Sequence, residues 1–137
     1  MFDWKFFLKC PLPHAKVLAR LGISSIHGIG VFAGQDIASG TVVFVNDSLE
    51  IRWVNTREVD ASLPTPFHQS LYDDFAVRRG ELLGTPESFD VLTVGWYVNE
   101  PNAGSEPNLR VSDDLNFIAA RDIKRGEELT IVYADFS

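Results

Sequence analysis

The chain has 137 residues, a length that suits one domain with its own hydrophobic core. Its 45% hydrophobic and 23% charged residues are ordinary for a globular protein, and no apolar run approaches the length of a membrane span. The net charge of −7 disfavours direct nucleic-acid binding and is compatible with a basic peptide as partner.

The cysteine and histidine residues indicate the cellular compartment and whether a metal site is expected. The single cysteine, Cys10, allows neither an internal disulfide nor a cysteine-built zinc site. His14, His27 and His68 have no metal-ligand spacing and are expected in turns or on the surface. The start of the chain lacks the apolar region and cleavage site of a signal peptide. These features predict an intracellular protein without a metal, in the cytoplasm or, in a eukaryote, the nucleus.

The chain opens with an aromatic arm at residues 1–13, where rings occupy positions 2, 4, 6 and 7. Pro11 and Pro13 end the arm, because proline fixes φ and lacks a backbone donor. So apolar a segment has to be covered. We expect it to pack over its own sheet or across a homodimer, and we favour the homodimer.

Short strands separated by tight turns follow the arm. β-branched and aromatic residues gather in each of them. The predicted strands cover residues 16–21, 31–33, 42–45, 49–54 and 116–120. Close-set strands without long helices between them predict a mostly β domain of several short sheets.

The middle of the chain predicts an insert and one helix. Residues 60–85 look like the insert, which begins with a surface loop at residues 60–70. Thr85 can cap a helix, and Pro86 suits its first position. We therefore predict a helix from Thr85 to near Gly95 that delivers the next aromatic residues into the centre of the fold.

The pattern Asp-Ile-x-x-Gly occurs twice, at residues 36–40 and 122–126, each time with an apolar strand close behind. Glycine suits the positive φ that such a turn can require. The echo is too short to be a sequence repeat. It predicts two similar hairpins within one β framework.

Two glycines bracket an apolar residue where residues 26–33 read IHGIGVFA. Taken alone, Gly28, Ile29 and Gly30 indicate only a tight turn. The segment precedes a strand and not a helix, and no acidic residue of the dinucleotide-binding type follows it. A Rossmann site is therefore disfavoured.

Two further motifs lie in the last third of the chain. Residues 99–108 read NEPNAGSEPN after an aromatic lead, with Asn99 and Asn108 at the two ends. Residues 120–133 read ARDIKRGEELTIVY and end on Tyr133.

In this order the three motifs resemble those of the SET domain, the family of protein-lysine methyltransferases that use S-adenosyl-L-methionine. The resemblance covers residues 17–136, so we predict a single SET domain over residues 1–137, with the arm in front and residues 60–85 as an insert. It implies a β-clip fold of several short sheets, with one or two short helices. It also implies a C-terminal segment threaded as a pseudoknot.

The resemblance further implies S-adenosyl-L-methionine as the cofactor and a lysine of a basic protein or peptide, such as a histone tail, as the substrate. The final tyrosine of the third motif is catalytic in the family and corresponds to Tyr133. No zinc is implied, because the cysteine clusters that flank many members are missing. The positions that correspond to cofactor-binding residues are Gly28, Ile29, Gly30, Tyr97, Asn99, Glu100, Asn108 and Tyr133.

The second motif departs from the family pattern Asn-His-Ser-Cys-x-Pro-Asn. Glu100 and Pro101 replace the His-Ser pair, and seven residues separate Asn99 from Pro107 where the pattern has four. The family histidine contacts the adenine mainly through its backbone, a contact that Glu100 can keep. Pro101 has no N–H to donate. We therefore expect a remodelled adenine end of the site.

Two alternatives remain open from the sequence. A non-catalytic β-clip binding module, of the kind in SAF domains and type III antifreeze proteins, has similar Asp-Ile-x-x-Gly turns and no methyl transfer. A degenerate SET domain would bind peptide after losing the cofactor through the change at Glu100 and Pro101. Cofactor binding would separate the enzyme from both.

Overall fold

The computed structural model describes residues 12–46 and 50–136, so the predictions for the aromatic rings of the arm lie outside it. Within the described chain, nine short strands form three antiparallel sheets of three strands each. No helix in this part is both long and apolar enough to cross a membrane. The predicted class, a mostly β domain of several short sheets, is confirmed.

The first sheet joins the front of the chain to its end. Its strands, in order of pairing, are β1 (Ala19–Ile23), β2 (Ile29–Ala33) and β9 (Glu128–Leu129). Val31 in β2 lies opposite Leu129 in β9, and both side chains are fully buried. The glycine-containing turn before β2 and the last strand are therefore neighbours in space.

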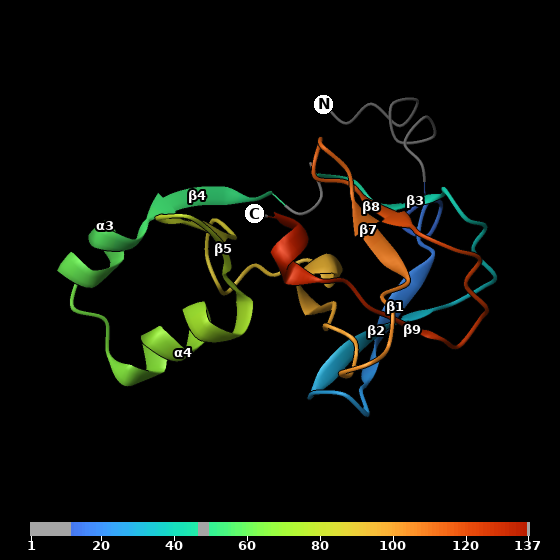
Figure 1. The fold of residues 1–137 in the computed structure, drawn as a ribbon, viewed down its shortest axis with the longest axis horizontal. Coiled ribbons are helices and arrows are strands. Elements are labelled where there is room, and N and C mark those ends of the chain that lie inside the picture. The colour runs from blue at the N-terminus through green and yellow to red at the C-terminus, as the bar shows by residue number, and fades with distance from the viewer. Residues whose placement is uncertain (1–11, 47–49, 137) are drawn as a thin grey trace, which may run out of the picture.

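Two further sheets complete the framework (Figure 1). One contains β3 (Val42–Phe44), β8 (Phe117–Ala119) and β7 (Leu109–Val111), in that order. The other contains β4 (Arg52–Asn55), β6 (Leu82–Thr85) and β5 (Val77–Arg79). Buried side chains of the first two sheets form one continuous core, which Val77 of the third sheet also joins.

Two short helices lie between β4 and β5. Asn55 caps α3 (Thr56–Ala61) by accepting the N–H of Arg57. Thr65 caps α4 (Pro66–Phe75) in the same way. Residues 60–70, predicted as a surface loop, therefore contain the end of α3 and half of α4. In Figure 1 these helices project with β4 and β5 to the left of the core strands.

The helix predicted after Thr85 is wrong. Thr85 is the last residue of β6, lies opposite Arg52 and is only 4% exposed, and its hydroxyl donates to the carbonyl of Arg52. The hydroxyl that would cap a helix is thus used within the sheet. The threonine-proline signal operates instead at Thr65 and Pro66, which begin α4. Between β6 and β7 there is instead a single 3₁₀ turn, η1 (Val94–Tyr97).

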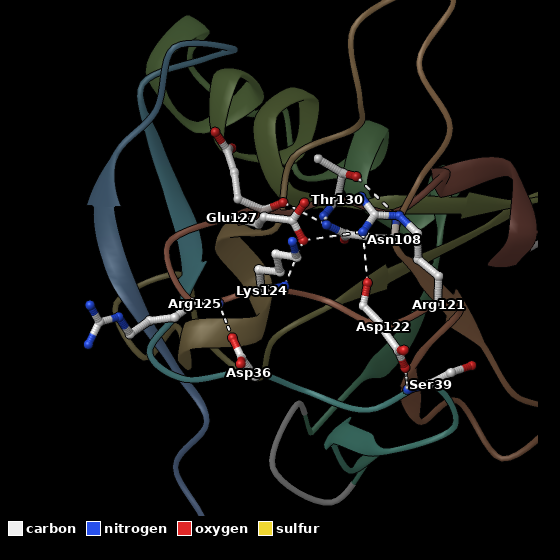
Figure 2. Close-up of polar contacts among 10 residues, drawn as sticks. Asp36, Ser39, Asn108, Arg121, Asp122, Lys124, Arg125, Glu127 and Thr130 are labelled. Atoms are coloured by element: carbon white, nitrogen blue, oxygen red, sulfur yellow. Dashed lines mark hydrogen bonds and ion pairs between the residues drawn. The ribbon is translucent and has the colours of Figure 1, made fainter.

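The two Asp-Ile-x-x-Gly segments do not form the predicted hairpins, because one joins β2 to β3 and the other β8 to β9, and each of these pairs of strands lies in two different sheets. The segments pair with each other instead. Ile37 and Ile123 form an antiparallel bridge, with N–H···O distances of 2.7 and 2.8 Å, and both side chains are buried. The carboxylate of Asp36 accepts the N–H of Arg125 at 2.9 Å, and that of Asp122 accepts the N–H of Ser39 at 2.8 Å (Figure 2). Each aspartate thus caps the turn of the other segment, a pseudo-twofold arrangement.

We expect Asp36→Ala and Asp122→Ala each to lower the free energy of unfolding by about 0.5–2 kcal/mol, because each leaves one turn N–H without its charged acceptor. Urea unfolding measures the change. Glu106→Ala is the matched control, an exposed loop carboxylate whose loss should cost less than about 0.5 kcal/mol. Aspartate variants that unfold at the control's urea midpoint would contradict this role.

Candidate active site

Residues 128–131 lie between the two ends of one loop, residues 99–108. On one side, Asn99 forms a parallel bridge with Thr130, and its carbonyl accepts the N–H of Ile131 at 3.0 Å. On the other side, the N–H of Leu109 donates to the carbonyl of Thr130 at 2.9 Å. This placement is the threaded C-terminal segment that the family resemblance implies.

Asn108 holds the threaded segment from inside the fold. Its side chain is 3% exposed; its Oδ1 accepts the N–H of Thr130 and its Nδ2 donates to the carbonyl of Glu128, both at 2.8 Å (Figure 2). The side-chain amide of Asn108 thus pairs with one backbone N–H and one backbone carbonyl of the segment, as a neighbouring strand would. Both ends of the Asn108 side chain bind β9 and the residue after it.

Asn99 brings the three motifs together. Its Nδ2 lies 3.0 Å from the carbonyl of His27 and 3.3 Å from that of Ile29, both in the first motif. It also lies 3.1 Å from the carboxylate of Glu128 in the third motif and 3.2 Å from the hydroxyl of Ser24. The two hydrogens of the amide are therefore shared among protein acceptors.

The carboxylate of Glu128 fills the space beside Gly30. The hydroxyl of Ser24 lies 2.8 Å from both of its oxygens. A β-carbon at Gly30 would collide with this carboxylate, so a larger residue there would force the side chain of Glu128 to shift. Gly28 adopts φ +48°, in the left-handed region that favours glycine. Glu128 and Ser24 were missed as site residues: Glu128 is visible only as part of the third motif, and Ser24 gives no sequence signal.

Tyr133 is fixed at both its ring end and its backbone end. Its hydroxyl donates to the carbonyl of Val98 at 2.6 Å, and its N–H donates to the carboxylate of Glu100 at 2.8 Å. Burial raises the pKa of Tyr133 to about 12, and the negative charge of Glu100 adds to this shift. The phenol is therefore protonated at neutral pH.

Two pockets meet at Tyr133. The first, of about 180 Å³, is lined by residues of all three motifs, among them Ile29, Asn99 and Tyr133. The second, of about 30 Å³, is largely apolar. The two pockets share Tyr133, Trp96 and Phe75 as walls. A side chain entering the second pocket would thus approach the first at Tyr133.

The insert supplies one wall of both pockets. Phe75 lies at the end of α4, and its ring packs edge-on against the ring of Tyr97 at a centroid distance of 5.6 Å. Asp74 beside it lines the first pocket. In Figure 1 the C-terminal turn η2 (Tyr133–Phe136), in red, lies between the insert and the core strands. Phe75, Asp74 and Trp96 were missed, because only the tertiary fold brings them here.

The structure divides the predicted cofactor residues into two groups. Four of them line the first pocket: Ile29, Tyr97, Asn99 and Tyr133. The other four do not line it: Gly28, Gly30, Glu100 and Asn108. The two glycines flank Ile29 in the sequence. Glu100 and Asn108 hydrogen-bond to the C-terminal segment. Within the described chain, no three histidine, cysteine, aspartate or glutamate side chains cluster in a way that could hold a metal ion.

Comparison with known proteins agrees with this geometry. The family model of the SET domain matches residues 28–134, well over half of the chain, and the protein therefore belongs to the SET domain family. Among solved structures, a Plasmodium falciparum "putative histone methyltransferase" is similar, with a TM-score of 0.50. It is 18% identical in sequence, and the match covers 84% of this chain and 96% of that chain, which shows the shared fold. No curated protein matches the sequence.

We expect Asn108→Ala to lower the free energy of unfolding by about 2–4 kcal/mol, because it strands two buried backbone groups of the threaded segment. Chemical denaturation measures this loss. Asn102→Ala is the matched control, since Asn102 is an exposed loop residue of the same motif. If the two variants are equally stable, Asn108 does not hold the C-terminal segment.

Proposed function

We propose that this protein transfers a methyl group from S-adenosyl-L-methionine to the side-chain amine of a lysine in a protein or peptide. The observation that carries the proposal is the position of Tyr133 where two pockets share their walls. One pocket is built from the family's cofactor motifs and the other is narrow and apolar. Membership of the SET domain family supports the same reaction.

The first pocket suits the cofactor chemically. Phe75 and Trp96 offer aromatic rings, and Asp74 adds a carboxylate. Both kinds of group attract a positively charged sulfonium. When bound, S-adenosyl-L-methionine supplies an electrophilic methyl group on that sulfonium. Because the nitrogen of Asn99 is shared among protein acceptors, we propose that its oxygen accepts from the cofactor's ammonium group.

Tyr133 would orient the incoming amine. With its pKa raised to about 12, the phenol keeps its proton at neutral pH and does not act as a general base. Its hydroxyl hydrogen is committed to Val98, which leaves the oxygen lone pairs as acceptors for the amine. A lysine has an ordinary pKa of about 10.4 and must lose its proton before it attacks. The chain then contributes alignment of the two reactants.

Charge favours a basic protein or peptide as the substrate. The chain carries a net charge of −7, and Asp74 and Glu100 place carboxylates close to Tyr133. Such a potential attracts a positively charged segment. We propose an intracellular protein or peptide, in the cytoplasm or nucleus, with the target lysine in a basic context.

We expect Tyr133→Phe to reduce methyl transfer at least ~100-fold, by analogy with the loss of one preorganised polar group, while the ring still packs. The assay uses labelled cofactor with a mixture of basic proteins. Tyr72→Phe is the matched control, because Tyr72 is half-buried on α4 and lies outside both pockets. It should retain activity. Equal rates for Tyr133→Phe and the parent protein would remove Tyr133 from the reaction.

We also propose a homodimer through the arm. A groove is lined by Leu12, which belongs to the arm, and by Val17, Val42 and Val45. These side chains are 67%, 59%, 41% and 48% exposed, in that order. Exposed apolar side chains gathered in one groove favour a covering partner. Light scattering at micromolar concentration should give twice the chain mass of 15.3 kDa. A single-chain mass would reject the dimer.

A further inference from the structure

A parallel pairing between the second and third motifs stops at Pro101. Asn99 bridges Thr130, and the N–H of Ile131 donates to the carbonyl of Asn99. In a parallel ladder the next pair of bonds would join the residue at 101 to both Ile131 and Tyr133. Pro101 has no N–H, so one of these bonds cannot form and the ladder cannot continue regularly.

In a continued ladder the N–H of Tyr133 would donate to the carbonyl of residue 101. Here it donates to the carboxylate of Glu100 instead. This carboxylate accepts the N–H of Tyr133 at 2.8 Å, while the carbonyl of Val98 accepts the hydroxyl of the same residue at 2.6 Å. Two residues, Val98 and Glu100, therefore hold Tyr133 at two points. The bond from Glu100 is charge-assisted, and such bonds are stronger than those to a neutral carbonyl.

We propose that Glu100 is a positioning residue for Tyr133, and that Glu100 and Pro101 form a compensating pair. The proline ends the ladder because it has no N–H, and the carboxylate of Glu100 takes the place of the carbonyl of residue 101 as acceptor for the N–H of Tyr133. The two departures from the family motif thereby maintain the placement of the tyrosine. This inference rests on the proposed role of Tyr133 in methyl transfer, but its main test requires no activity.

The test titrates the Tyr133 phenol by its ultraviolet absorbance after a rapid jump to alkaline pH, read before the protein unfolds. Subtracting the Tyr133→Phe titration isolates this residue. Glu100→Gln keeps an acceptor oxygen and removes the charge, so the pKa of Tyr133 should fall toward its ordinary value. Glu106→Gln, which removes an exposed carboxylate of the same loop, should leave it unchanged. An unchanged titration in Glu100→Gln would overturn the proposal.

A double-mutant cycle tests the compensation. Pro101→Ala restores an N–H at this position, so the ladder can continue and Tyr133 depends less on the carboxylate. Glu100→Ala should therefore destabilise the fold less in the Pro101→Ala background than in the parent protein, as measured by urea unfolding. Equal losses in both backgrounds would overturn the pairing of the two residues.

Where methyl transfer is measured, Glu100→Ala should lower kcat about tenfold and change the KM for the cofactor much less, with Glu100→Gln intermediate. An effect on KM alone would make Glu100 a binding residue and contradict the positioning role. If the protein transfers no methyl group, the titration and the cycle still decide whether Glu100 holds Tyr133. Failure of the inference and failure of the proposed function are therefore distinguishable.

Discussion

The candidate site depends on the hydrogen bonds that hold the threaded C-terminal segment between the two ends of residues 99–108. Backbone and side-chain groups of Asn99 and Asn108 bind this segment from opposite sides. The bonds of the two side chains are buried or partly buried, so losing a partner would leave polar groups with little access to water. Tyr133 follows the segment directly, and its position therefore depends on both asparagines. The site therefore forms only when the first, second and third motifs have come together in the folded chain.

Much of the fold was predictable because its signals are local. The positive φ of Gly40 and Gly126 and the third motif depend on neighbouring residues, and these predictions agree with the structure. The two hairpins expected from the Asp-Ile-x-x-Gly segments do not form, because strand pairing across the whole chain places the flanking strands in different sheets. The helix predicted after Thr85 fails because burial opposite Arg52 overrides a sound capping signal. Trp96 was expected in the centre of the fold but not as a pocket wall, and Phe75 had no signal, since it comes from a distant element that reaches the pockets only in the tertiary structure. The bond from Glu100 to Tyr133 is unpredictable for the same reason.

The altered second motif has a physical explanation that does not require a lost site. Asn99 still joins the first and third motifs, and the carboxylate of Glu100 accepts the N–H of Tyr133 where the ladder ends at Pro101, which has no N–H. A β-carbon at Gly30 would meet the carboxylate of Glu128, so the first motif packs closely against the threaded segment. The departures therefore lie within the network that places Tyr133. They leave Ile29, Tyr97 and Asn99 lining the first pocket.

We propose that this pocket binds S-adenosyl-L-methionine, and a calorimetric titration of the purified protein with the cofactor can decide it. We expect one site per chain with a micromolar dissociation constant, a binding free energy of about −8 kcal/mol. The absence of binding at millimolar cofactor would contradict the proposal. The chain would then be a SET domain that has kept its fold and lost its cofactor.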